Sequence, residues 1–448
     1  MSRKALFFFP HNPWPPRTGA HCRVLQMLSG LRELGCHITL ASTSLYSDNP
    51  WLPKCERDLV EAGFVDDVRL YRPSPRDLAI TALLAVGYAS TGRRPPLDSL
   101  FYTPPDLLRW FNQLVEATKP DALVINYAYW AALAGVPAAR SCQKVIDTYD
   151  LVSLNRAMQA ALVPYITGPV NMLAPHHRIT NMIRGKLGKL GPVIDPARID
   201  VDALQESFFE RSSLRPDPQE FAIFDRFDHT IAITCAEADL IRRHTTRTAV
   251  SLISMTQAPH EIPNTYAGPA LFAVGPNPFN LQGYLYFVRR VLPLVLRQEP
   301  LFKLQVTGAW YSHLRPQPQA GIILSGFVPD LAPIYASARF VVCPVYGGTG
   351  QQIKIIEAMA YGLPVVALAS AAERSPLEHG KSGLVARDAD EFAEHIVRLW
   401  RDHALCQRLG EEARATVTTS ASMPRLLNDL ACLLGTTEVD TDSPARGC

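Results

Sequence analysis

A glycine-rich turn followed by a lysine and a glutamate is the part of this sequence best suited to chemistry. Residues Val341–Ala367 read VVCPVYGGTGQQIKIIEAMAYGLPVVA, a pattern that predicts a strand, a turn, a helix and a second strand. Gly347, Gly348 and Gly350 would let the backbone approach a ligand closely. The helix that follows offers free N–H groups and the positive end of its dipole, so the turn is a candidate anion site.

Two charged side chains lie on one face of that helix. Lys354 and Glu357 are three residues apart, so they are neighbours on its surface. The lysine could meet a diphosphate and the glutamate could accept hydrogen bonds from a ribose diol. The alternative is a solvated ion pair of no functional weight. The turn, the pair and the strand after them favour the anion site when taken together.

The same segment resembles the donor-site signature of glycosyltransferase family 4, whose members have the GT-B fold. The family pattern is G-x-G-x-x-x-K-x-x-E-A-M-A-x-G-x-P-V-V. The residues that match it are Gly348, Gly350, Lys354, Glu357, Ala358, Met359, Ala360, Gly362, Pro364, Val365 and Val366. The similarity extends from about Leu271 to Val417. It implies two facing Rossmann-like domains and transfer of a sugar from a nucleotide-diphosphate sugar with retention of anomeric configuration.

The resemblance also implies roles for particular residues. Lys354, Glu357 and Arg23 would be catalytic. The donor would be bound by residues of the glycine-rich turn and of loops that follow strands: Gly19, Gly275, Asn277, Gly308, Gly348, Thr349, Gly350, Gln351, Lys354 and Glu357. With a lysine available for the diphosphate, we expect no required metal and no other cofactor. Retention by attack on the leaving-group face needs no protein nucleophile.

The first half of the chain resembles the family less. The loop Pro16–Ala20 and Arg23 stand where the family has a glycine-rich loop near the donor phosphates and the acceptor, although a solvated arginine at a helix start fits equally well. Residues 145–150, VIDTYD, resemble a strand-end D-T-H-D of some relatives. Capping of the next helix by the aspartates is the alternative. The predicted acceptor-side residues are Asn126, Asp147, Tyr149 and Asp150.

Three departures from the family pattern keep other functions open. Thr349 stands where many members have a second glutamate, Asn126 stands where a cleft histidine is common, and no cation follows the first strand of the second half until Arg289. An inactive partner subunit of the same fold, or a nucleotide-sugar epimerase, would fit as well. A dinucleotide-dependent oxidoreductase is disfavoured, because Ile353 occupies the place of the third glycine of G-x-G-x-x-G.

The elements that must position these residues alternate between strand and helix. In the first half, strands are predicted at 5–9, 38–41, 68–71, 122–126, 144–147, 230–234 and 251–255, with helices such as 20–34 and 104–117 between them. The alternation restarts at Leu271, with helices at 281–296, 331–336, 353–360 and 389–401 and strands at 271–274, 304–307, 322–324, 340–344 and 364–367. The sequence therefore predicts two doubly wound parallel sheets. The predicted domains are 1–262, with a variable insertion at about 155–220, and 263–434, followed by a disordered tail at 435–448.

Composition narrows the partners and the compartment. The 448 residues carry a formal net charge of +2, which does not indicate a nucleic-acid binder. Nine scattered cysteines without a C-x-x-C favour a reducing, cytoplasmic setting. No apolar stretch has the length of a membrane span. The acceptor would be a small molecule, a saccharide or a lipid-linked compound.

Two segments could contact the inner face of a membrane peripherally. Residues 155–194 hold five basic residues and no acidic one, and could touch anionic lipid or hold a lipid-linked acceptor. An ordinary solvated insertion is the alternative. Leu78–Tyr88 with Arg93 and Arg94 is the second segment of this kind.

Overall fold

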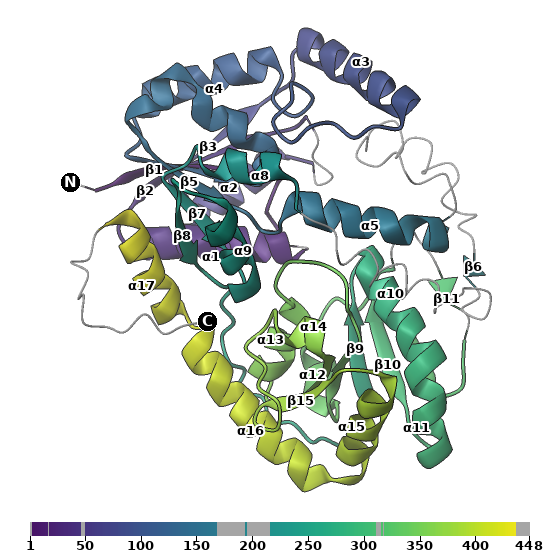
Figure 1. Ribbon diagram of the computed structural model, residues 1–448. Coiled ribbons are helices and arrows are strands. Elements are labelled where there is room, and N and C mark those ends of the chain that lie inside the picture. The colour runs from purple at the N-terminus through teal and green to yellow at the C-terminus, as the bar shows by residue number, and fades with distance from the viewer. Residues whose placement is uncertain are drawn as a thin grey trace.

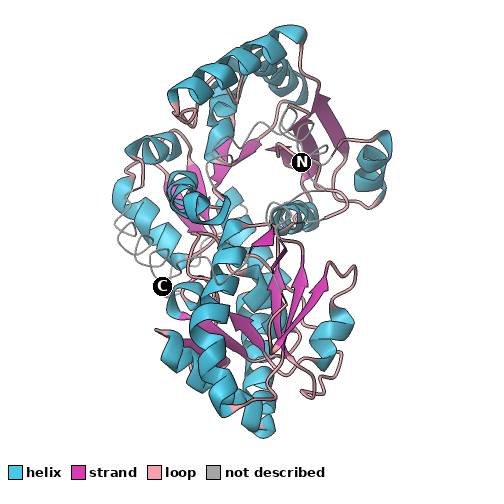
Figure 2. Ribbon diagram, turned by 90° about the vertical axis from the view of Figure 1, so that its right-hand side faces the viewer, coloured by secondary structure: helices cyan, strands magenta, loops and turns pink. Residues whose placement is uncertain are grey.

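A computed structural model describes residues 2–16, 18–45, 50–167, 193–194, 216–310, 315–316 and 318–435, which form two α/β domains stacked one above the other (Figure 1). Most of the insertion at 155–220, and the tail beyond Gly435, lie outside the described residues. Figure 2 shows the two sheets as separate layers, each covered by helices. The predicted alternation of strands and helices is confirmed in both halves.

The first domain contains a seven-stranded parallel sheet in the order β3-β2-β1-β4-β5-β7-β8. Its strands are β1 (Lys4–Phe8), β2 (His37–Thr43), β3 (Asp67–Tyr71), β4 (Ala122–Asn126), β5 (Gln143–Asp147), β7 (His229–Ala232) and β8 (Ala249–Leu252). Its helices are α1 (Gly19–Glu33), α2 (Pro53–Glu61), α3 (Pro75–Thr91), α4 (Pro105–Thr118), η1 (Ala128–Gly135), η2 (Pro137–Ser141), α5 (Val152–Thr167), α8 (Pro218–Phe224) and α9 (Cys235–His244). Side chains from both faces of the central strands are buried, as a sheet covered by helices on both sides requires.

The second domain contains a six-stranded parallel sheet in the order β12-β10-β9-β13-β14-β15. Its strands are β9 (Ala270–Val274), β10 (Leu304–Gly308), β12 (Ile322–Gly326), β13 (Val341–Cys343), β14 (Val365–Leu368) and β15 (Gly383–Ala386), and a separate short pair joins β6 (Val193–Ile194) to β11 (Arg315–Pro316). Its helices are α10 (Pro278–Tyr286), η7 (Phe287–Val291), α11 (Leu292–Gln298), α12 (Ala332–Ser337), α13 (Ile353–Ala360), α14 (Ala369–Ala372), α15 (Ala389–Arg401) and α16 (His403–Ser420), and α17 (Met423–Leu434) follows them in the chain.

The long helix predicted at 281–296 is interrupted. A π-helical turn at η7 separates α10 from α11. Pro293 follows this turn and has no N–H for the carbonyl four residues earlier, and its ring would crowd that carbonyl in a regular helix. The local widening of the helix accommodates the proline.

The last helix returns to the first domain, although the sequence analysis assigned residues 263–434 to the second. Leu426, Leu430, Leu433 and Leu434 of α17 join the core that includes Phe7 and Leu28. Figure 1 shows α17 lying beside α1 and β8. Gly30 on α1 makes room for this contact, because a Cβ there would lie 2.6 Å from the Leu430 side chain. The chain therefore both begins and ends its described part on the first domain.

Candidate active site

The glycine-rich turn between β13 and α13 needs its glycines. Gly348 has φ +98°, a conformation that favours glycine. A Cβ on Gly347 would lie 2.3 Å from the Phe279 ring, and one on Gly350 would lie 2.5 Å from a carboxylate oxygen of Asp150. The turn is therefore pressed between α10 of its own domain and the end of β5 in the first domain, with the N-terminus of α13 directly after it.

Lys354 and Glu357 do not pair with each other. The Lys354 ammonium donates a hydrogen bond of 2.6 Å to the side-chain oxygen of Asn280, whose amide in turn donates to the Gly275 carbonyl at 3.1 Å. Among the described residues no carboxylate forms an ion pair with Lys354, and burial lowers the pKa of its ammonium. A desolvated cation with only a neutral partner favours an anionic ligand. Asn280 was not identified as a site residue from the sequence.

Arg374 is a second cation at this turn, and the sequence analysis missed it. Its guanidinium donates to the carbonyls of Ser370 at 2.8 Å and Gly350 at 3.4 Å, and the side chain is 7% exposed. No ion pair joins it to a carboxylate in the part of the chain that the structure describes, and burial lowers its pKa. The signal in the sequence was its place shortly after β14, at the carboxyl edge of the sheet, where ligands of such folds bind.

Glu357 is held in place by an aromatic stack. The Tyr335 hydroxyl donates to the Glu357 carboxylate at 3.1 Å. The Tyr335 ring stacks on Tyr361 with centroids 4.6 Å apart, and Tyr361 stacks on His260 at 3.8 Å. Burial raises the pKa of the Glu357 carboxyl. The carboxylate is therefore fixed on the same helix as Lys354, one turn further on.

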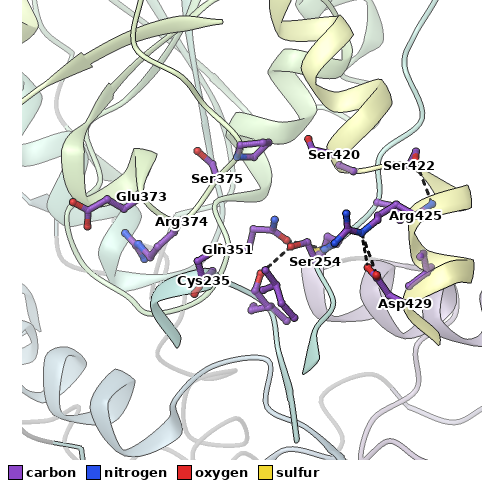
Figure 3. A pocket seen from close by; sticks show the side chains of 18 residues that line it. Cys235, Ser254, Gln351, Glu373, Arg374, Ser375, Ser420, Ser422, Arg425 and Asp429 are labelled. Atoms are coloured by element: carbon purple, nitrogen blue, oxygen red, sulfur yellow. Dashed lines mark hydrogen bonds and ion pairs between the residues drawn. The ribbon is translucent and has the colours of Figure 1, made fainter. Parts of the chain in front are cut away.

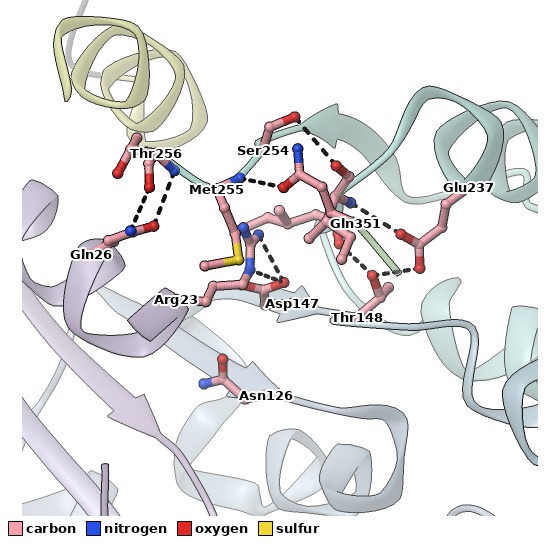
Figure 4. A network of polar contacts seen from close by, with 12 residues as sticks. Arg23, Gln26, Asn126, Asp147, Thr148, Glu237, Ser254, Met255, Thr256 and Gln351 are labelled. Carbon is pink, nitrogen blue, oxygen red and sulfur yellow. Dashed lines mark hydrogen bonds and ion pairs between the residues drawn. The ribbon is translucent and has the colours of Figure 1, made fainter. Parts of the chain in front are cut away.

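Arg23 is not a solvated side chain. It lies 2% exposed and makes a bidentate ion pair with Asp147, with Nε–Oδ2 2.9 Å and Nη2–Oδ1 3.1 Å (Figure 4). The guanidinium also lies 5.5 Å from the centroid of the Tyr149 ring. Asp147 thus binds Arg23 instead of capping a helix through its side chain. This pair joins α1 to the end of β5.

The other predicted acceptor-side residues surround that pair. Asn126 is buried and donates to the Phe8 carbonyl at 2.6 Å. Tyr149 is buried with φ +61°, and Tyr127 beside it has φ +68°. Such backbone strain in non-glycine residues is often found at functional sites. The two rings lie 4.5 Å apart and form one wall at the carboxyl ends of β4 and β5.

Asp150 brings the two domains together at the glycine-rich turn. Its carboxylate accepts a hydrogen bond of 3.0 Å from the Thr349 hydroxyl, and burial raises its pKa. A Cβ on Gly19 would lie 1.9 Å from the Ile353 side chain, so the start of α1 also touches the start of α13. The residues predicted from the two halves therefore meet at one place.

The remaining predicted donor residues have mainly structural contacts. Asn277 caps α10 by accepting from the Phe279 N–H at 2.8 Å. Gly308 packs on β9, since a Cβ there would lie 1.8 Å from the Val274 carbonyl oxygen. The Gln351 side chain accepts from the Met255 N–H at 2.8 Å and so binds the segment that connects the domains (Figure 4).

A cavity of about 250 Å³ lies between the domains on the side of that connection (Figure 3). Ser254, Ser420 and Ser422 line it together with Gln351 and Arg374. Of the residues predicted from the sequence as site residues, Gln351 alone lines this cavity. Its wall therefore includes one face of the candidate site but not Lys354 or Glu357.

Comparison with known structures identifies the fold as GT-B. Sucrose-phosphate synthase from Thermosynechococcus elongatus is 16% identical, with a TM-score of 0.59 over 97% of this chain and 98% of that one. HepE from Anabaena, solved with UDP and glucose, is 13% identical, with a TM-score of 0.57 over 97% of this chain and 100% of that one.

Sequence comparison identifies the domain that carries the glycine-rich turn. Residues 268–402 match the family described as glycosyl transferases group 1, which confirms that the second half resembles a glycosyltransferase. An uncharacterized 44.6 kDa protein in the cps region of Klebsiella pneumoniae is 27% identical over 130 residues, and this match covers 27% of the chain and 34% of that protein. In the described part of the chain, no helix has the length and apolarity to cross a membrane.

Proposed function

We propose that the chain is a glycosyltransferase of family 4 that transfers a sugar from a nucleotide-diphosphate sugar with retention of configuration. One observation carries the proposal. Lys354 is a half-buried cation and Arg374 a buried one, neither has a carboxylate ion-pair partner among the described residues, and both lie at a glycine-rich turn before a helix. A diphosphate would supply the missing negative charge, and the α13 N–H groups would bind it as well. The group 1 glycosyl transferase match to the same domain supports this assignment.

Each residue then has a specific task. Lys354, hydrogen-bonded to Asn280, stabilises the departing diphosphate, and Glu357 accepts hydrogen bonds from the ribose. Arg374 supplies a second cation for the diphosphate. The loop after β9, where many members of the family have cations, contains none. These are electrostatic and positioning contributions, which suit a reaction in which the acceptor attacks on the leaving-group face. No metal and no protein nucleophile is required in this scheme.

Asp150 compensates for the departure at Thr349. The family glutamate is replaced by a threonine, but the Thr349 hydroxyl binds the Asp150 carboxylate from the first domain. A carboxylate is therefore present beside the turn, and we assign it to the hydroxyl groups of the transferred sugar. Arg23 becomes a positioning residue, since its pair with Asp147 fixes the end of β5 from which Asp150 projects.

The acceptor side is the wall made by Asn126, Tyr127 and Tyr149, and a saccharide, a small molecule or a lipid-linked compound could lie there. Thr349 stands in place of the family glutamate, and this replacement favours a second candidate, in which the chain is an inactive partner subunit of the same fold. An epimerase would use the donor without any acceptor.

A ligand screen distinguishes these functions. UDP, GDP, ADP and dTDP and their sugars would be tested by thermal shift and calorimetry without added metal, beginning with UDP-glucose because HepE has been solved with it. We expect one nucleotide class to bind and its sugar to be slowly hydrolysed. Binding of none by a folded sample would reject the transferase and favour the partner subunit. Release of an epimerised sugar without acceptor would favour the epimerase.

The Glu357→Ala variant tests the ribose assignment separately. Loss of a charged hydrogen-bond partner should weaken binding of the nucleoside diphosphate by about 1.5–3 kcal/mol. A dissociation constant equal to that of the unchanged protein would remove the ribose role of Glu357.

A further inference from the structure

Helix α3 of the first domain exposes several of its apolar side chains. Of its 17 residues only Asp77 and Thr81 are buried, and both are polar. Leu83 is 74% exposed, Val86 68% and Leu78 42%. A surface helix normally turns its apolar stripe toward the core, so an exposed apolar face calls for a partner.

The attachment of α3 explains why a charged residue faces inward, on the same side as the half-buried Leu84 and Tyr88. The Asp77 carboxylate accepts from the Tyr71 hydroxyl at 2.7 Å and from the Leu107 N–H at 3.0 Å, so it ties the first turn of α3 to the start of α4. Ser74 caps the helix, and Gly92 ends it in a left-handed conformation. Figure 1 shows α3 at the outer edge of the first domain, beside α4. The helix is therefore firmly built, and the exposure of its apolar face is not the result of fraying.

Positive charge surrounds this apolar face. Arg72 stands at one end and Arg93 and Arg94 at the other, and all three are exposed, whereas the exposed Arg76 pairs with Asp106 of α4 at 3.6 Å. The segment 72–97 contains one acidic residue, Asp77, which is buried. Apolar side chains between arginines are the pattern of a helix that lies in the interface of an anionic bilayer. With 17 residues it is shorter than the roughly 20 that span one.

We propose that α3 docks on the surface of an anionic phospholipid bilayer, with Leu83 and Val86 inserted between the lipids and the arginines at the headgroups. We name α3 with Arg72, Arg93 and Arg94 the docking surface. The occupant is a membrane and not a second copy of the chain, because the exposed Arg72, Arg93 and Arg94 would be repelled by the same arginines of another copy.

The docking surface is continuous with the acceptor side of the candidate site. The Arg94 guanidinium donates to the Arg156 carbonyl at 2.9 Å, and the Arg156 guanidinium lies 4.3 Å from the centroid of the Tyr129 ring. The Tyr129 ring is 6.5 Å from Tyr127, which belongs to the wall at β4 and β5. Docking would thus bring that wall close to the membrane, where a lipid-linked acceptor is presented. The docking itself does not depend on the proposed transferase function.

The test is flotation of the full chain with vesicles of phosphatidylcholine alone, and of phosphatidylcholine with about one third phosphatidylglycerol. We expect binding to the anionic vesicles only, weakened by salt. The double variant Leu83→Glu/Val86→Glu should bind at least about tenfold more weakly, and Arg93→Gln about fivefold more weakly. Leu301→Glu is the matched control, since Leu301 is 81% exposed on the second domain and should leave vesicle binding unchanged.

Three results would overturn the proposal: no binding to anionic vesicles, equal binding to both kinds, or unchanged binding by the double variant. A dimer that light scattering detects, and that the double variant disperses, would identify a second copy as the occupant instead. Thermal melting verifies that the variants fold, and nucleotide binding by the double variant should equal that of the unchanged protein. A failure of docking is therefore distinguishable from a failure of the transferase function.

Discussion

The cations of the two domains differ in the partners that their side chains bind. In the first domain, Arg23 is paired with a carboxylate, since its Nε and Nη2 donate to the two oxygens of Asp147. In the second, Lys354 has the neutral Asn280 as its partner, and Arg374 has backbone carbonyls. A buried cation depends on its internal carboxylate, because loss of that partner would leave an unpaired buried charge, whereas a cation without such a partner is available to an anionic ligand. Neither the residue types nor their positions in the sequence distinguished the cation that has a carboxylate partner from the two that have none.

Breaking the first-domain pair should have the largest effect. Asp147→Ala would leave the Arg23 charge buried and unpaired, so the free energy of unfolding should fall by about 3–5 kcal/mol in a denaturant titration. Asp67→Ala is the control, since its ion pair with Arg69 has side chains 39% and 58% exposed and its loss should cost less than about 1 kcal/mol. Equal losses in the two variants would contradict the structural role given to Arg23.

The second-domain cations should affect turnover instead of folding. Lys354→Ala should reduce kcat/KM by an amount equivalent to about 2–4 kcal/mol, with little change in melting temperature, because its charge is matched by the diphosphate and not by the fold. Arg374→Gln should act in the same direction. Lys381→Ala, which removes an exposed lysine paired with Glu378, should leave turnover unchanged. If Lys354→Ala melted early and kept its turnover, the comparison between the domains would fail.

Glu237 extends the comparison between the domains to a buried carboxyl group of the first domain. It is buried beside Asp147 and Asp150, accepts from the Thr148 hydroxyl and the Ile233 N–H, and burial raises its pKa to about 8. The folded state therefore holds a proton that the unfolded state has released above the ordinary pKa of 4.5. Stability should fall by about 2 kcal/mol between pH 6 and pH 8 and level off above that. The control is Glu237→Gln, which should lack this component, so an identical pH profile in both proteins would show that the carboxyl is ionised when folded.

The smallest effect is expected at the stack that holds Glu357. Tyr335→Phe keeps the ring that stacks on Tyr361 and removes the hydroxyl that donates to the carboxylate. Nucleotide affinity should fall by about 0.5–1.5 kcal/mol in calorimetry, with turnover at saturation nearly unchanged. A rise in affinity would mean that Tyr335 competes with the ribose for Glu357.

The sequence predicted the sheet strands apart from β15 (Gly383–Ala386), because parallel strands buried on both faces are short apolar runs between helices. Strand β4 and helices α13 and α15 begin and end where the pattern placed them. The return of α17 to the first domain could not be read in this way. An amphipathic pattern shows that a helix has a face to bury, but it does not show which domain covers that face.

The candidate site was predictable where it is local and not where it depends on tertiary contacts. Gly348, Gly350, Lys354 and Glu357 lie within one turn and helix, so their spacing was informative. The contacts of Arg374 with Gly350 and of Asp150 with Thr349 join residues that lie 24 and 199 positions apart in the chain. Contacts between residues so far apart produce no periodic pattern in the sequence. Only the positions of Arg374 and Asp150 after strands indicated that they could belong to the site.

The return of α17 has a mechanical consequence. Within the described residues, the polypeptide crosses between the domains near Met255–Thr256 and again near Ala421–Ser422, and Gln257 N–H bonds the Ala421 carbonyl where the two crossings meet. Two adjacent chain connections permit rotation of one domain relative to the other about an axis through both connections. They resist other relative movements of the two domains. A rotation of one domain about that axis would change the distance between Asp150 and Thr349, which lie on opposite domains.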